Sequence, residues 1–219
     1  DLLAGEIDYI TLTPTEMLPV FEKTGKHESA AIPLPGSSVQ IVPNHTQPPF
    51  NNVKIRQALQ MVIKQTDFLT ALYGDRPGVW RTCPAIFMCG SPYETDVNSE
   101  RYMNQNFDKA KALLKEAGYD GTPVLYMHPM DSRLQNEGGT VLVQAMRKAG
   151  FVVTDVQMDS ATFFSRRNNK GTPAEGGWNL FLTAFNGDAM LDPLINPYVT
   201  GACEKAFVGW PCDKQLQSH

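Results

Sequence analysis

The sequence has no excess of basic residues and no long apolar run. Among its 219 residues, 19 are Lys or Arg and 23 are Asp or Glu, which gives a formal net charge of −4. Proteins that bind nucleic acids present a basic surface to the phosphate backbone, so this balance excludes nucleic acid as an expected partner. No apolar run approaches the ~20 residues that a membrane-spanning helix needs.

Cysteine is scarce, and its spacing offers no metal site. The four cysteines are Cys83, Cys89, Cys203 and Cys212. No Cys-x-x-Cys pair occurs and the four histidines do not cluster with the cysteines, so neither a zinc ion nor another cofactor is expected. Four cysteines allow three disulfide pairings, of which the two closely spaced ones, Cys83 with Cys89 and Cys203 with Cys212, suit an oxidising compartment. Four unpaired thiols in a cytosolic protein are the alternative.

An initiator methionine and a signal peptide are also absent, because the chain begins at Asp1. This predicts a processed product or a piece of a longer protein. Hydrophobic residues nevertheless make up 42% of the chain. A chain of this size buries roughly 70% of its unfolded surface, so it can form a core without bound metals.

Apolar periodicity predicts strands and helices that alternate along most of the chain. Strands are expected at 5–10, 38–43, 123–127, 151–158 and 178–184. Helices are expected from 14 to about 25, from 53, and over 66–73, 107–117, 134–149, 160–167 and 193–199. This order favours an α/β fold with a mixed sheet flanked by helices. Residues 75–105 are rich in Pro, Gly, Ser and Asn and predict a long irregular segment.

Helix-capping residues precede four of the predicted helices. Thr13 is expected to cap the first, with Pro14 at its first position, and Asn52, Asn106 and Ser160 are expected to cap three others. A side-chain oxygen at the cap accepts a hydrogen bond from a free backbone amide of the first turn.

The segment from Asn44 to Leu59, with Pro48-Pro49-Phe50-Asn51-Asn52 at its centre, resembles a motif of the extracellular solute-binding proteins of family 5. These are the dipeptide- and oligopeptide-binding proteins of ABC importers. Further segments resemble the family in the same order along the chain: Gly5-Glu6-Ile7-Asp8, the helix Asp108–Tyr119, Gly177-Trp178-Asn179-Leu180, Asp192-Pro193, and the late turn Gly209–Asp213. The resemblance covers nearly the whole chain.

The resemblance implies one lobe of a type II periplasmic binding protein, in which two lobes close around a ligand. Residues 1–38 would be the remnant of the first lobe leading to the hinge, and 39–219 the second lobe without its C-terminal end. The implied function is transport without catalysis: a di- or oligopeptide or another small solute is captured in the periplasm or outside the cell. The implied partners are the membrane permease and the missing first lobe of the same chain.

The resemblance also implies ligand-binding residues. Asp188 matches the Asp that pairs with the α-ammonium group of a peptide, Phe185 takes the position of a pocket aromatic, and Asn186 lies beside it. Gln40 is the only polar residue of the cleft strand 39–42. Asp192-Pro193 lies one residue further from Asp188 than in the dipeptide binders. The alternatives are an exposed turn carboxylate for Asp188, core packing for Phe185 and a strand without ligand contact for 39–42.

A hydrolase-like enzyme is the alternative function. Asp188 and Asp192 lie four residues apart on a predicted turn and could form a carboxylate pair. Against this, the sequence shows no Ser-His-Asp set, no metal-ligand set and no phosphate-binding glycine loop.

Overall fold

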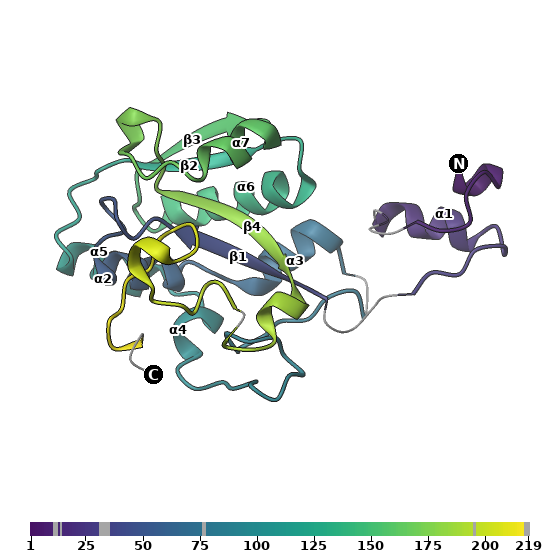
Figure 1. Ribbon diagram of the computed structural model, residues 1–219, viewed down its shortest axis with the longest axis horizontal. Coiled ribbons are helices and arrows are strands. Elements are labelled where there is room, and N and C mark those ends of the chain that lie inside the picture. Colours follow the sequence, from purple (N-terminus) through teal and green to yellow (C-terminus); the bar gives the residue numbers. More distant parts are fainter. Residues whose placement is uncertain (11–12, 14, 31–35, 76–77, 195, 217–219) are drawn as a thin grey trace.

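The computed structural model describes residues 1–10, 13, 15–30, 36–75, 78–194 and 196–216. Its centre is a mixed four-stranded sheet with the order β1-β4-β2-β3 (Figure 1). Strand β4 runs antiparallel to β1 and parallel to β2, and β3 runs parallel to β2. The strands are β1 Ser37–Pro43, β2 Val124–Pro129, β3 Val153–Met158 and β4 Leu180–Asn186. The predicted α/β class with a mixed sheet is confirmed.

Helices flank this sheet. The α-helices are α1 Leu18–Glu22, α2 Val53–Met61, α3 Gln65–Tyr73, α4 Glu100–Met103, α5 Phe107–Glu116, α6 Arg133–Lys148 and α7 Ser160–Arg166. The 3-10 helices are η1 Leu2–Ala4, η2 Thr15–Met17, η3 Pro173–Glu175, η4 Gly187–Met190 and η5 Cys203–Lys205. The predicted irregular segment 75–105 is confirmed for its described residues before α4 and is wrong for Glu100–Met103, which form that helix.

Alternation along the strands divides the core between the two faces of the sheet. Leu180 and Leu182 of β4 pack with Tyr126 of β2 in the larger cluster, to which α2, α3, α5 and α6 contribute. Phe181 and Met127 point the other way, into a smaller cluster with Phe163 of α7 and the two tryptophans Trp178 and Trp210. The sheet is therefore covered by helices on one face and by α7 and the C-terminal turns on the other.

Side-chain caps explain where several helices begin. Asn52 accepts a hydrogen bond from the Lys54 amide at 2.9 Å and Asn106 one from the Lys109 amide at 2.8 Å, which confirms both predicted caps. For α7 the prediction is wrong: the cap is Asp159, whose carboxylate accepts from the Thr162 amide at 2.9 Å. A carboxylate one residue earlier satisfies the free amides of the first turn, so Ser160 becomes the first residue of the helix.

The predicted strand at 5–10 is wrong. Gly5 adopts φ 74° and ends η1, and the residues after it are irregular and mostly exposed. None of the described strands pairs with this segment, and an unpaired strand is not stable in water. The first long helix, predicted from 14 to about 25, is described as η2 followed by α1, which ends at Glu22. Its predicted start at Pro14 lies outside the described residues.

A helix at 193–199 is likewise not found in its described residues, which form turns. The Asp192 carboxylate accepts from the Leu194 amide at 2.7 Å, and Pro197 has no amide to donate to a helix. The short helices of this region are η4 and η5 instead.

Asn179 joins three segments of the body at the start of β4. Its side chain is fully buried, accepts from the Leu125 amide at 2.8 Å and donates to the Pro48 carbonyl at 2.7 Å. Its own carbonyl accepts from the Asn44 amide at 2.8 Å. These bonds hold the Pro-Pro loop before α2 against the sheet, which gives the motif around Pro48 a structural role.

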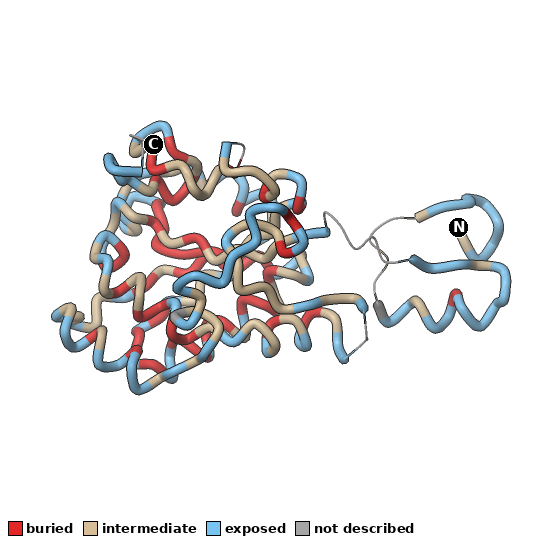
Figure 2. Tube along the Cα trace, turned by 90° about the horizontal axis from the view of Figure 1, so that it is seen from below, coloured by how far each residue is buried: buried red, intermediate tan, exposed pale blue. Residues whose placement is uncertain are grey.

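The described part of residues 1–30 forms an arm beside the body, seen at the right of Figure 1. Figure 2 shows that this arm is mostly exposed, whereas the buried residues gather in the body. Both closely spaced cysteine pairs form disulfides in the body: Cys83–Cys89 with an S–S distance of 2.05 Å and Cys203–Cys212 with 1.99 Å.

Candidate functional site

The end of β4 and the turn after it carry three of the four residues implied as ligand contacts. Strand β4 pairs with β1 up to the couple Ser37 and Asn186. The chain then enters η4, where the Gly187 amide donates to the Gly36 carbonyl at 2.8 Å. The start of β1 and the end of β4 are thereby held together at the same end of the two strands.

Gln40 and Phe185 lie on the same face of this strand pair. In the antiparallel register Gln40 is opposite Thr183 and Phe185 is opposite Ser38, and residues two apart on a strand share a face. The Gln40 amide nitrogen donates to the Ser38 hydroxyl at 2.7 Å. Asn186 follows Phe185 directly, so it belongs to the opposite face, and it is exposed.

Phe185 packs in a cluster of three aromatic rings. Its ring centroid lies 5.1 Å from that of Tyr198 and 5.4 Å from that of Phe207, both nearly perpendicular to it. Edge-to-face contacts of this kind stabilise a ring beyond its area burial. Phe185 is half-buried, so it stays partly accessible to solvent while its ring packs in this cluster.

Burial changes the chemistry of Tyr198 in this cluster. It raises the pKa of the Tyr198 phenol, because the charged phenolate would lose its hydration; Arg167 partly opposes this shift. The Tyr198 hydroxyl is buried and has no hydrogen-bond partner among the described residues. The Tyr198 side chain is therefore uncharged where its ring packs against Phe185.

Asp188 lies exposed in the first turn of η4. Its carboxylate accepts one hydrogen bond, from the Ala189 amide at 2.9 Å. Asp192 accepts in the same way from the Leu194 amide of its own turn. Each carboxylate is thus oriented by its local backbone, and the described hydrogen bonds do not join the two.

The structure therefore gathers the four implied residues on two neighbouring strands and the turn that follows. Gln40 and Phe185 share a face, Asp188 extends beyond the strand end, and Asn186 points to the other face. No described hydrogen bond or ion pair links any two of them.

A hollow of about 580 Å³ lies elsewhere on the C-terminal turns. Lys170, Lys205, Phe207 and Trp210 are among its lining residues, and none of the four implied residues lines it. The Lys170 ammonium lies 5.3 Å from the centre of the Trp210 ring. Phe207, one of the lining residues, also contacts Phe185.

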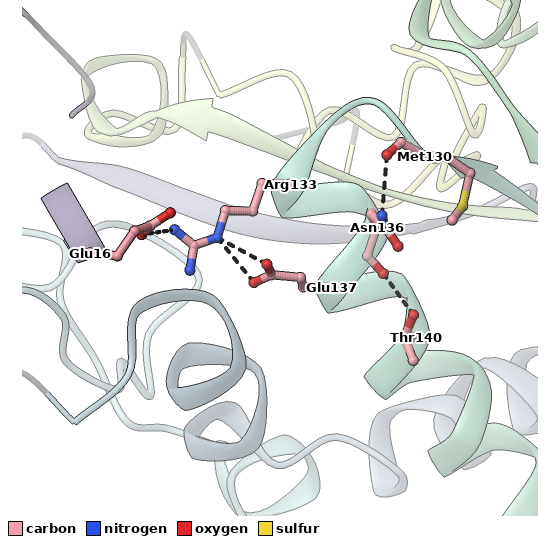
Figure 3. Close-up of polar contacts among 6 residues, drawn as sticks. All are labelled: Glu16, Met130, Arg133, Asn136, Glu137 and Thr140. Atoms are coloured by element: carbon pink, nitrogen blue, oxygen red, sulfur yellow. Dashed lines mark hydrogen bonds and ion pairs between the residues drawn. The ribbon is translucent and has the colours of Figure 1, made fainter. Parts of the chain in front are cut away.

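The start of α6 carries a small network of polar contacts, drawn in Figure 3. Arg133 donates to the carboxylates of Glu137 at 3.0 Å and of Glu16 at 2.8 Å. Asn136 donates to the Met130 carbonyl at 3.1 Å and accepts from Thr140 through its own carbonyl at 2.9 Å. Glu16 belongs to η2, so this network joins the arm to the body.

A contact that the sequence analysis missed reaches η4 from the irregular segment after α3. The Met88 amide donates to the Met190 carbonyl at 3.3 Å. The close spacing of Cys83 and Cys89 in the sequence indicates a short loop closed by a disulfide. The spacing does not indicate which part of the protein that loop contacts.

Two other features do not occur among the described residues. No group of three or more His, Cys, Asp and Glu residues there could hold a metal ion. Nor is any described helix both long enough and apolar enough to cross a membrane.

Comparison with known families decides what kind of protein this is. The family model "Bacterial extracellular solute-binding proteins, family 5 Middle" matches residues 1–206. The chain belongs to this family. The resemblance drawn from the Pro-Pro-Phe motif and the segments around it is confirmed.

Two curated relatives agree with this assignment. The chain is 28% identical over 218 residues to the probable peptide ABC transporter periplasmic-binding protein y4tO of Sinorhizobium fredii, covering 99% of this chain and 41% of the relative. It is 33% identical over 128 residues to the probable deoxycholate-binding periplasmic protein YgiS of Escherichia coli, covering 58% of this chain and 22% of the relative. The chain thus spans less than half the length of the curated relatives it matches.

The fold of this family 5 chain is shared with solved structures. The ABC transporter substrate-binding protein CtaP of Listeria monocytogenes superposes with a TM-score of 0.74 at 20% identity, covering 99% of this chain and 43% of that one. Together with the mixed sheet, this confirms the fold of a type II periplasmic binding protein.

Proposed function

We propose that this family 5 chain is part of the substrate-binding component of an ABC importer, which captures a peptide between two lobes and delivers it to a membrane permease. The observation that carries the proposal is the family match over residues 1–206. The near-complete alignment with a relative named as a peptide ABC transporter periplasmic-binding protein supports it.

In this proposal, residues 1–38 belong to the first lobe and 39–219 to the second. The mostly exposed arm supports the division, because its apolar side chains Leu3, Ile7 and Tyr9 lack the cover that a folded lobe would provide. The two disulfides and the names of the relatives support a periplasmic or extracellular location.

Asp188 is the proposed partner of the peptide's α-ammonium group. It is an exposed carboxylate at a strand end, and a carboxylate offers more acceptor positions than its one described hydrogen bond uses. Charge-assisted hydrogen bonds are about twice as strong as neutral ones. Phe185 would supply apolar contact, and Gln40 and Asn186 polar contacts.

The proposed action is binding rather than catalysis. A hydrolase with a carboxylate pair would need Asp188 and Asp192 to face a common substrate atom, whereas each accepts from the backbone of its own turn. Capture by a few polar groups in an apolar cleft needs no reactive side chain.

One observation favours a second ligand class, amphipathic anions such as deoxycholate. The relative YgiS is named for deoxycholate, an amphipathic carboxylate. The Asp188 carboxylate would repel such an anion, whereas it would attract a peptide ammonium. The two classes therefore make opposite demands on Asp188.

The test measures binding by the full-length protein to a pool of di- and tripeptides, to the same pool N-acetylated, and to deoxycholate. Free peptides are expected to bind, and acetylation or Asp188→Asn is expected to weaken binding about tenfold or more, since a charged hydrogen bond contributes ~1.5–3 kcal/mol. Asp213→Asn is the matched control, because Asp213 is also an exposed turn carboxylate that accepts from backbone amides. Binding of deoxycholate alone would contradict the peptide proposal.

A further inference from the structure

The disulfide Cys83–Cys89 closes a loop that contacts η4, the turn that carries Asp188. The contact is the hydrogen bond from the Met88 amide to the Met190 carbonyl at 3.3 Å. Cys89 and Met190 are both almost fully buried, with 4% and 2% of their surface exposed. The hydrogen bond therefore joins parts of the loop and of η4 that lie next to buried residues.

The loop is anchored to the body at its first cysteine by Gln65, the first residue of α3. The Gln65 side chain donates to the Cys83 carbonyl and accepts from the Cys83 amide, both at 2.8 Å. This double hydrogen bond fixes the backbone of Cys83 as a neighbouring strand would. Because α3 packs through Phe68 in the larger core cluster, Cys83 is tied to the rigid part of the body.

Further contacts fix the rest of the loop. The Tyr102 hydroxyl donates to the Pro84 carbonyl, and the Arg81 guanidinium donates to the Cys89 carbonyl. The Ser91 amide donates to the Met88 carbonyl at 3.0 Å, so the peptide unit next to the η4 contact is held as well. The Gln65 bonds tie Cys83 to α3, and the disulfide ties Cys83 to Cys89, the residue after Met88. The Met88 amide is thereby linked to α3.

We infer that the disulfide-closed loop Cys83–Cys89 is a positioning element for the ligand site, because it holds η4, and with it Asp188, at the end of β4. At its first residue η4 is attached to the start of β1 by the bond from Gly187 to Gly36. The loop supplies the second attachment, at Met190. A ligand that uses Asp188 then binds to a turn that is already ordered, and binding does not have to order it.

The role of the loop in ligand binding rests on the proposed function, so the test has one readout that needs no ligand. Amide hydrogen exchange over residues 186–192 is compared in the full-length protein for wild type, for Cys83→Ser/Cys89→Ser and for the matched control Cys203→Ser/Cys212→Ser. The control removes a disulfide of similar loop length, nine residues apart instead of six. Exchange over 186–192 is expected to rise several-fold in the first variant and to rise less in the control, whose loop meets β4 through Phe207 and Phe185.

The second readout is affinity for the free di- and tripeptide pool. Cys83→Ser/Cys89→Ser is expected to bind about fivefold or more weakly than the control, the lower end of typical coupling between two sites. Gln65→Leu keeps the disulfide and removes both bonds to Cys83, so it is expected to change both readouts in the same direction even if the double Cys variant does not fold.

The outcomes separate the two proposals. Unchanged exchange over 186–192 in Gln65→Leu and in a folded double Cys variant overturns the positioning role, whatever the wild type binds. Raised exchange with peptide affinity equal to that of the control overturns the link to Asp188. A wild type that binds no peptide overturns the proposed function instead, and the exchange data still decide whether the loop holds η4.

Discussion

His45 lies just after β1, where its surroundings disfavour a positive charge. Its backbone amide donates to the Gly209 carbonyl at 2.8 Å, and Arg56 of α2 lies close enough to act on its ring. Burial, and secondarily the charge of Arg56, lower the pKa of His45 from 6.5 to about 4. The folded chain therefore keeps this ring neutral at pH values where the unfolded chain protonates it.

The shift predicts a loss of stability on acidification. Between pH 6.5 and 4 the unfolded state binds a proton at His45 that the folded state does not, so the free energy of unfolding falls as the pH falls through this window. Since the ring is only partly buried, we expect a loss of about 1–2 kcal/mol from this residue after allowing for solvent screening. Urea denaturation at pH 7 and pH 4.5 measures it.

His45→Gln is the control for this prediction. The variant cannot protonate at this position, so its loss between the two pH values should be smaller than that of the wild type by the same amount. Equal losses in both proteins would show that other groups carry the acid sensitivity.

At the scale of the elements, α6 contains two adjacent glycines with different surroundings. A β-carbon at Gly138 would lie 3.4 Å from the nearest atom of Leu182, an ordinary contact. A β-carbon at Gly139 would lie 2.5 Å from the Tyr126 hydroxyl and 2.8 Å from His128 Nε2. At Gly139 the Tyr126 and His128 side chains of β2 leave no room for a β-carbon, which explains a residue of low helix propensity there.

These distances predict opposite effects for two equal substitutions. Gly138→Ala should leave the free energy of unfolding unchanged or raise it by up to about 1 kcal/mol, because Ala favours the helix. Gly139→Ala should lower it by about 1–3 kcal/mol, because the buried Tyr126 and His128 side chains must shift to admit the methyl group. Urea denaturation of both variants tests this, and similar stabilities for the two would contradict the close approach.

The elements differ in how far local sequence determines them. Asn52 and Asn106 cap their helices as predicted, because a cap acts within three residues of its own position. The segment 5–10 has the composition of a strand, but a strand needs a partner, and no described strand pairs with the arm. The order β1-β4-β2-β3 places the first and the last strand side by side, which local patterns do not report.

At the scale of the whole molecule, one described ion pair joins the arm to the body. Arg133 of α6 bridges Glu16 of η2 and Glu137 of its own helix (Figure 3). The side chains of Arg133 and Glu16 are 42% and 61% exposed. Water screens such a pair strongly, so it orients the arm without contributing much stability.

We therefore expect Arg133→Gln to lower the free energy of unfolding by less than about 1 kcal/mol. The small effect should also disappear at 1 M salt, where the screening length is only ~3 Å. Urea denaturation at low and high salt measures both. A larger loss that persists in salt would mean that Arg133 holds the arm through more than this exposed pair.

The sequence by itself determined the family, the α/β class and most helix boundaries of this protein. These depend on motif order, on periodicity and on caps, each of which is written into neighbouring residues, as in Pro48-Pro49-Phe50 and Asn52. Only the tertiary structure decided that Gln40 and Phe185 share a face while Asn186 does not, and that Met88 reaches Met190. The reason is physical. The register of β1 with β4 and the bond from Met88 to Met190 join residues about 100 or more positions apart in the sequence. The free energy of such contacts depends on the whole folded chain.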